Sequence, residues 1–287
     1  PEETYDVLKK YGSDLVELAR NKKLDPSVDL AVIAKTTAGF TGADLANLLN
    51  EAALLAARYN LRTIGMEEIQ NAMIKITVGT EKKTRVMSDK EKKLTAFHEA
   101  GHAVISRLIP GQDPVHQISI IPHGRAGGYT MNLPSEDKSY TTKGEILDDI
   151  AVLLGGRAAE KLTLDDISTG ASNDIERATK AARQMVTKYG MSDTLGPICY
   201  GSDHDEVFIG RDFVQSKNLS ENISSVIDNE VKNIVEAQYE RCLKILNENR
   251  EHLDNVANAL IEREKLTGEE FEKVFCGQKL DSMPQII

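Results

Sequence analysis

The chain has 287 residues, 40% hydrophobic and 28% charged, a balance typical of soluble globular proteins and sufficient for one large or two modest domains. The formal net charge of −10 argues against nucleic acid as a partner, because duplex binding requires a basic surface. No apolar run approaches the roughly 18 residues that span a bilayer, and three scattered cysteines without a CxxC motif favour a reducing compartment over a disulfide framework.

Residues 12 to about 78 have the pattern of a small bundle of short amphipathic helices. The clearest helix spans 41–60, where Thr41 is the expected N-cap and Asp44 follows three residues later. Apolar residues then recur with the helical period, at Leu45, Leu48, Leu49, Ala52, Leu55 and Ala56. Shorter helices are expected at 25–36 and 65–77.

A polar, charged stretch at 80–93 is the expected linker between two domains. At its end, Ser88 and Glu91 form a capping-box pattern, which predicts a helix from about Asp89. Pro110 should stop this helix.

The remaining pattern predicts a mainly α-helical domain with one small β-sheet. Two strands, 115–122 and 129–134, are joined by a glycine-rich turn, and alternation places Tyr129, Met131 and Leu133 on one face of the second strand. Helices are expected at 143–162 and 172–190, followed by two or three more between Ser220 and Phe275.

The segment TAFHEAGHAVI, residues 95–105, carries the strongest chemical signal. On a helix, His98 and His102 lie one turn apart and can present two imidazoles to one metal ion, with Glu99 beside it as a general base. Ala100 and Gly101 should leave room for the ion and a substrate. The pattern arises by chance in roughly one per cent of such chains, and the predicted helix supports a catalytic zinc site over two solvated histidines.

A catalytic zinc ion needs a third protein ligand and an open position. The downstream carboxylates are Glu160, Asp165, Asp166 and Asp174. Asp165 and Asp166 lie in an expected loop, whereas Asp174 opens a helix, where capping holds the backbone. Periodicity therefore favours Asp174 over Glu160, but leaves both open.

Several separated motifs, in order, resemble one known family. FHEAGHAV, SIIPHGRAGGYT, GGRAAE and STGASNDIERAT resemble the peptidase domain of the FtsH family of ATP-dependent zinc proteases. GFTGADLANLLNEAALLAAR resembles the lid subdomain of that family's AAA ATPase module. The resemblance covers roughly residues 20–275 and implies a helical lid at 1–80 followed by a zinc-metallopeptidase domain at 81–287.

The resemblance also implies the site. The family's zinc ligands fall on His98, His102 and Asp174, with one Zn²⁺ per chain and Glu99 as the catalytic base. Glu160 is then expected beside the site without ligating the metal. The family's members are membrane-anchored homohexamers that pull unfolded, damaged or membrane polypeptides into a proteolytic chamber.

The strand after the glycine-rich turn resembles the family's substrate-binding edge strand. A peptide would add to it through main-chain hydrogen bonds at Gly127, Gly128, Tyr129 and Thr130. A hairpin that merely closes the fold is the alternative. His123 is expected to be a turn residue, and His116, His204 and His252 surface residues.

The sequence contains no GxxxxGK[ST] motif, so ATP is expected to act only in a longer parent protein. The opening without methionine is consistent with a soluble fragment of such a protein. The parent is expected in a bacterial inner membrane, with this portion on the cytoplasmic side and membrane contact through other segments. The runner-up hypothesis is a hexameric assembly module in which hydrolysis is incidental.

Overall fold

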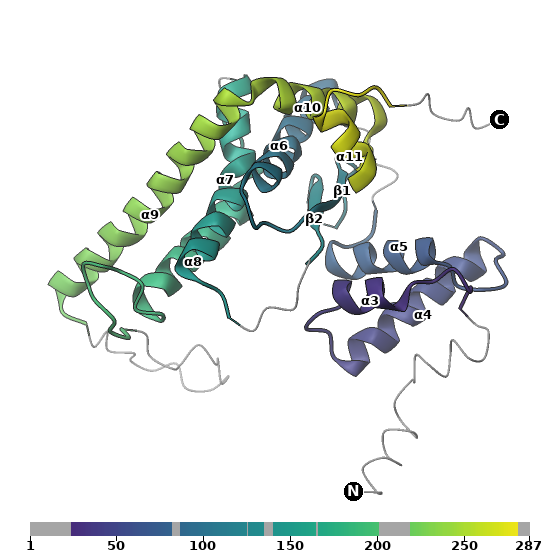
Figure 1. Cartoon of the computed structure of the whole chain (residues 1–287), viewed down its shortest axis with the longest axis horizontal. Coiled ribbons are helices and arrows are strands. Elements are labelled where there is room, and N and C mark those ends of the chain that lie inside the picture. The colour runs from purple at the N-terminus through teal and green to yellow at the C-terminus, as the bar shows by residue number, and fades with distance from the viewer. Residues whose placement is uncertain are drawn as a thin grey trace, which may run out of the picture. The chain divides into compact units, whose positions relative to one another are not determined.

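The computed structural model describes residues 24–81, 87–124, 126–134, 140–164, 166–200 and 219–280. Their contacts form two compact units (Figure 1). The first holds the described residues up to 81, together with those of 121–129 and 133–134, and the second holds the others. Across the described helices, none combines the length and apolarity needed to cross a bilayer.

The first unit is a small helical bundle, as the sequence predicts over its described part. Its described helices are α3 (Leu30–Thr36), α4 (Gly42–Arg58) and α5 (Met66–Thr77). The predicted capping box at the start of α4 is confirmed, since Thr41 and Asp44 bond each other's backbone amides. Helices α4 and α5 pack around a buried cluster of Leu24, Ile33, Leu48, Leu49, Ala52, Ile69, Ala72 and Met73. The predicted residues 12–23 of this unit lie outside the described part.

The second unit is mostly helical, which confirms the predicted fold class. Its described elements are α6 (Asp89–Leu108), β1 (Val115–Ser119), β2 (Tyr129–Asn132, of which 130–132 belong to this unit), α7 (Lys143–Leu164), α8 (Ser172–Thr187), α9 (Glu221–Glu248), α10 (Arg250–Arg263), β3 (Lys265–Thr267) and α11 (Gly268–Phe275). One apolar core, which includes Ile105, Ile118, Leu154, Met185 and Leu260, joins the helices to the sheet.

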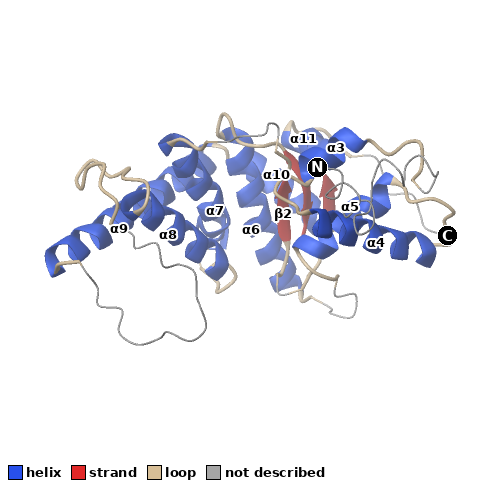
Figure 2. Cartoon of the chain, turned by 90° about the horizontal axis from the view of Figure 1, so that it is seen from below, coloured by secondary structure: helices blue, strands red, loops and turns tan. Residues whose placement is uncertain are grey.

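Helix α6 runs through the middle of this unit, between α7 and the strands (Figure 2). It begins where the sequence predicts, because Ser88 accepts from the Glu91 amide and Glu91 returns a bond to the Ser88 amide. It ends at Leu108, where Ile109 turns to an extended conformation before Pro110. All residues from Ala96 to Ser106 are buried, so the histidine motif is enclosed on several sides.

Helices α6 and α7 approach each other so closely that only glycine fits at the crossing. A Cβ atom on Gly101 would lie 2.4 Å from the carbonyl oxygen of Gly155, and one on Gly155 would lie 2.8 Å from the carbonyl oxygen of Gly101. The expectation that Gly101 leaves space for an ion or a substrate is therefore wrong. It allows α7 to pack directly on the helix that carries the histidines.

Among the described residues, the sheet has three strands in the order β2-β1-β3. β1 and β3 are antiparallel, with Ile118 opposite Leu266. β3 is an addition to the two predicted strands, and Thr267 at its end caps the start of α11. β2 occupies an outer position in the sheet.

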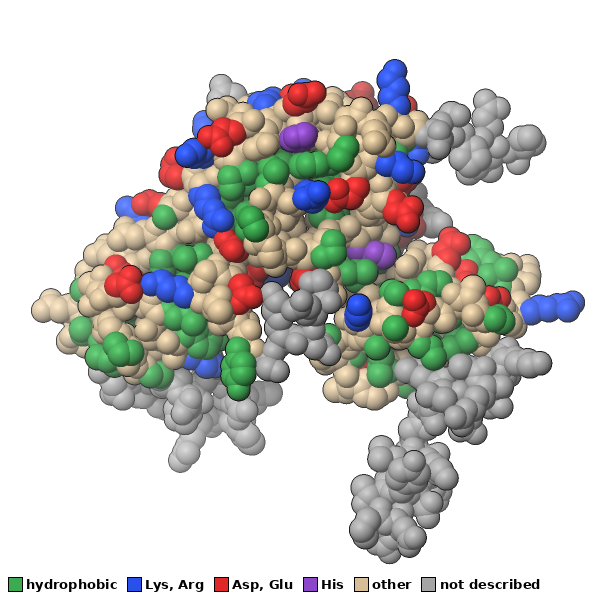
Figure 3. Space-filling view, in the orientation of Figure 1, with side chains coloured by type: hydrophobic (Ala, Val, Ile, Leu, Met, Phe, Trp, Pro, Cys, Tyr) green, Lys and Arg blue, Asp and Glu red, His purple; other side chains and the backbone are tan. Residues whose placement is uncertain are grey.

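The surface mixes charges of both signs. Figure 3 shows lysine and arginine side chains interspersed with aspartate and glutamate over the face drawn. Several ion pairs join them in the second unit, such as Arg183 with Asp228 and Arg107 with Glu272. Exposed pairs of this kind each contribute at most about 1 kcal/mol.

Candidate metal centre

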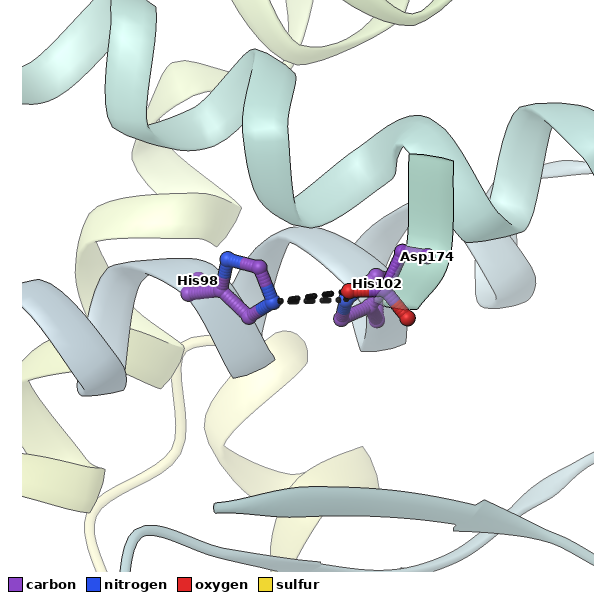
Figure 4. Close-up of side chains that lie close together, drawn as sticks. All are labelled: His98, His102 and Asp174. Atoms are coloured by element: carbon purple, nitrogen blue, oxygen red, sulfur yellow. Dashed lines mark hydrogen bonds and ion pairs between the residues drawn. The ribbon is translucent and has the colours of Figure 1, made fainter. Parts of the chain in front are cut away.

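Three side chains from two helices converge on one point (Figure 4). His98 and His102 lie one turn apart on α6, and Asp174 lies in the first turn of α8. The two Nε2 atoms are 3.1 Å apart, and Asp174 Oδ2 is 3.3 Å from Nε2 of His98 and 3.6 Å from Nε2 of His102. The structure thus brings together the three residues proposed as ligands.

The other nitrogen of each imidazole is already engaged. Nδ1 of His102 lies 2.7 Å from the Val152 carbonyl oxygen, and Nδ1 of His98 lies 2.7 Å from Glu160 Oε1. A carbonyl oxygen and a carboxylate are acceptors, so each Nδ1 carries the proton. In the neutral rings, both Nε2 lone pairs then point at the same spot as the Asp174 carboxylate.

Three converging lone pairs repel one another unless a cation or a shared proton lies between them. Two imidazole nitrogens and one carboxylate oxygen form a donor set that suits Zn²⁺, which in catalytic sites takes three protein ligands and leaves one position open. Hydrogen bonds to the opposite ring nitrogens fix the imidazoles, as is usual for zinc-ligating histidines. The residues present therefore fit a zinc ion.

The charges around the site favour a bound proton when zinc is absent. Burial alone would lower the pKa of His98, but hydrogen bonds to Asp174 and Glu160, together with the negative charges of Glu99 and Asp174, outweigh burial and raise the pKa to about 10. Burial likewise opposes ionisation of Asp174, yet hydrogen bonds from His102 and His98 lower its pKa below the usual value. A proton on His98 and a zinc ion compete for the same nitrogen.

We therefore expect zinc affinity to depend on pH. Below a pH of about 10, zinc must displace the His98 proton, so the apparent affinity should fall by roughly tenfold for each unit that the pH drops. Competition with a chromophoric chelator at pH 6, 7 and 8 measures this slope. An affinity that is the same at all three values would contradict the assigned proton.

Glu160 links the first histidine to the segment that leads to Asp174. Its side chain is fully buried, and besides His98 it accepts from the Ser168 amide at 2.8 Å and the Ser168 hydroxyl at 3.1 Å. Arg157 donates to the Ser168 carbonyl at 2.9 Å. α7 thus holds both His98 and the turn before α8 in place. Glu160 bonds Nδ1 of His98, the ring nitrogen that faces away from the proposed metal position.

The backbone of α7 also forms one wall of the site. Gly156 faces the two imidazoles: a Cβ atom there would lie 2.6 Å from Nε2 of His102 and 2.6 Å from Cε1 of His98. These distances are far inside normal contact. The bare backbone at this position lets the rings take up their observed orientation.

The Glu99 side chain contacts β2. The residue is 5% exposed, and burial raises the pKa of its carboxyl group, although His98 and His102 oppose the shift. The Thr130 hydroxyl donates to Glu99 Oε2 at 2.9 Å. The carboxylate is close enough to His98, His102 and Asp174 for their charges to affect its ionisation, which suits a base acting beside a metal.

The proposed substrate residues lie around the start of β2. Gly127 is exposed, Gly128 is buried, and Tyr129 is 8% exposed with its ring edge-on to His123. Of the predicted apolar face, only Tyr129 is buried, and Met131 and Leu133 are half-buried. The side chain of Thr130 faces α6.

The other candidate residues play no part in this cluster. Asp166 is exposed and accepts from the Ile167 amide, and Asp165 and His204 lie outside the described residues. His123 is in the turn, as predicted, but is buried and bonds the Ile121 carbonyl. Two histidines predicted to be at the surface, His116 and His252, are half-buried. The His252 ring stacks on the Phe275 ring, and its Nδ1 lies 2.8 Å from the Phe275 carbonyl oxygen.

The sequence interpretation missed four contacts that shape the site: those of Val152, Gly156, Ser168 and the Thr130 side chain. The sequence contains a signal for one of these contacts, that of Gly156. Gly155 and Gly156 interrupt a strongly helical pattern, and glycine inside a helix costs stability unless a close contact requires it. Every residue has a backbone carbonyl, so the sequence cannot indicate that the carbonyl of Val152 bonds His102.

Comparison with known proteins places the chain among characterised families. Residues 85–274 match the model of peptidase family M41, and residues 27–71 match that of the AAA+ lid domain. The chain is 58% identical over 269 residues to the "ATP-dependent zinc metalloprotease FtsH" of Caldicellulosiruptor bescii, covering 94% of this chain and 43% of that protein. It is 57% identical over 265 residues to the "ATP-dependent zinc metalloprotease FtsH 1" of a Thermoanaerobacter species, covering 92% and 43%. The chain thus spans less than half the length of these relatives.

Proposed function

We propose that this chain, which belongs to peptidase family M41, is the zinc-dependent proteolytic part of a longer ATP-dependent enzyme that hydrolyses polypeptides. The observation that carries the proposal is the convergence of His98, His102 and Asp174, with Glu99 beside them. The lid domain would comprise residues 1–80 and the peptidase domain residues 81–287.

In this proposal His98, His102 and Asp174 hold one Zn²⁺ per chain. When bound, zinc lowers the pKa of water toward about 7 and polarises a peptide carbonyl. Glu99 accepts the proton of the attacking water and returns it to the leaving amine, which balances the protons of the hydrolysis. The raised pKa of Glu99 suits this exchange, since a base with a pKa nearer neutrality can also act as an acid.

We propose that the substrate binds as an extra strand along β2, through the main chain of residues 127–130. The support is the outer position of β2 in the sheet and the proximity of Thr130 to Glu99. Main-chain pairing gives broad sequence tolerance, which suits an enzyme acting on many polypeptides.

The whole protein would carry further functions. From the resemblance to the FtsH family, we propose that the longer protein is a membrane-anchored homohexamer, with this portion on the cytoplasmic side. ATP hydrolysis in its other segments would feed unfolded, damaged or membrane polypeptides to the site.

A metal-removal experiment tests the proposed activity. The purified chain should contain one zinc per chain by elemental analysis and should cleave an unfolded casein-type substrate, which requires no ATP-driven unfolding. A chelator should abolish cleavage, and added Zn²⁺ should restore it. Replacing His98 with glutamine should prevent zinc loading, whereas the same change at His116, outside the cluster, should not.

Two outcomes would contradict the proposal. The first is cleavage that continues undiminished after zinc is fully removed. The second is a zinc-loaded chain that assembles as a hexamer and hydrolyses no unfolded substrate, which would favour the assembly module instead.

A further inference from the structure

The outer strand β2 is fastened to the catalytic helix by two side chains. Thr130 donates from its hydroxyl to Glu99 Oε2 at 2.9 Å, and the same hydroxyl is 3.2 Å from the Glu99 carbonyl oxygen. Two residues along, Asn132 donates from Nδ2 to the Ser106 hydroxyl at 2.7 Å. Residues two apart share a face of a strand, and Glu99 and Ser106 are two helical turns apart on α6, so one polar face of β2 lies along α6.

The carboxylate of Glu99 needs such a partner. A glutamate side chain has three rotatable bonds, and orienting it costs conformational entropy. A hydroxyl that bonds Oε2 directs one oxygen toward β2 and leaves Oε1 free to accept a proton from water. Threonine is well suited to this role, because its branched Cβ restricts the side chain to few rotamers.

Strand β2 can contact the general base and a bound peptide at the same time. In a β-strand the main-chain groups lie in the plane of the sheet, whereas the side chains stand roughly perpendicular to it. The main chain of β2 can therefore pair with a peptide along the outer edge while the Thr130 hydroxyl bonds Glu99.

We propose that Thr130 is a positioning residue for the general base: its hydroxyl orients the Glu99 carboxylate, so that β2 aligns both the peptide and the base. This inference rests on the function proposed above. It assigns to the Thr130 side chain a role in the chemical step, separate from the main-chain contacts of the strand.

The test compares Thr130→Val, which keeps the shape of the side chain and removes the hydroxyl, with Thr130→Ser, which keeps the hydroxyl. On a short fluorogenic peptide, Thr130→Val should lower kcat by about tenfold to a hundredfold with little change in KM, the range expected for losing a hydrogen bond to a charged group. Thr130→Ser should stay within about threefold of the unaltered chain. Zinc content should be unchanged in both.

A second measurement does not depend on turnover. A short peptide hydroxamate binds zinc and passes its hydroxyl proton to the base, so its affinity reports the orientation of Glu99. Calorimetry should show about tenfold weaker binding to Thr130→Val and little change for Thr130→Ser. Thr187→Val is the matched control, because it removes a hydroxyl bond of 2.8 Å to the Arg183 carbonyl at the far end of α8.

The results distinguish a failure of the Thr130 role from a failure of the proposed protease function. Equal kcat and equal hydroxamate affinity in Thr130→Val and the unaltered chain would overturn the role of Thr130. A rise in KM at constant kcat would overturn it as well, since the side chain would then act on substrate binding. If the zinc-loaded unaltered chain neither cleaves the peptide nor binds the hydroxamate, the proposed function fails, and the positioning role fails with it.

Discussion

Replacing Glu99 with glutamine is expected to abolish hydrolysis and to leave one zinc ion bound per chain. Glutamine has the size of glutamate and can still accept the Thr130 hydroxyl bond, but its amide cannot take a proton from water. Removing a general base typically costs about 10² to 10⁴-fold in rate. Cleavage of an unfolded substrate, measured together with zinc by elemental analysis, checks both halves of the expectation.

The matched control is Glu176→Gln, which makes the same chemical change on an exposed residue of α8, two residues after Asp174. Its activity and zinc content should equal those of the unaltered chain. If Glu99→Gln retained both its zinc and its full activity, the base would have to be another group. A loss of zinc together with activity would instead assign Glu99 to metal retention.

The helix that carries these residues could be predicted from local sequence alone. Ser88 and Glu91 define its start, Pro110 defines its end, and the spacing of His98 and His102 needs only the helical repeat. Asp174 could be placed in the first turn of a helix by the same kind of argument. These are local features, and the structure confirms them.

The choice between Glu160 and Asp174 could not be made from periodicity, because both carboxylates reach His98. Glu160 meets Nδ1 from α7 and Asp174 meets Nε2 from α8. Which nitrogen each one faces depends on how three helices pack, and only tertiary structure contains that information. The family resemblance instead identified Asp174 as the third ligand, and the position of Asp174 in the structure agrees with that choice.

Two further features lie beyond a local interpretation. β3 has three residues, too few for an alternating pattern, and exists because Leu266 pairs with Ile118 about 150 residues earlier in the chain. The sequence suggested that Gly101 leaves room beside a metal, but Gly101 packs directly against the backbone of Gly155 on another helix. In both cases a distant segment gives the residue its role.

The second large effect is expected from a single methyl group at Gly156. In Gly156→Ala the added Cβ would lie 2.6 Å from Nε2 of His102 and 2.7 Å from Nδ1 of His98. The helices cannot easily separate to relieve this contact, because the backbones of α6 and α7 already touch at Gly101 and Gly155. The imidazoles must turn away, and the convergence of the ligands is lost.

We expect zinc affinity to fall by about tenfold to a hundredfold in Gly156→Ala, since overpacking costs about 1–3 kcal/mol and here acts directly on two ligands. Chelator competition measures the affinity, and circular dichroism checks that the helices persist. Gly144→Ala is the control, because it lies on the same helix and its Cβ would meet only the Thr142 hydroxyl at 4.0 Å. Zinc bound as tightly by Gly156→Ala as by Gly144→Ala would mean that the rings can hold the metal in another orientation, and that the bare backbone of α7 does not determine the site.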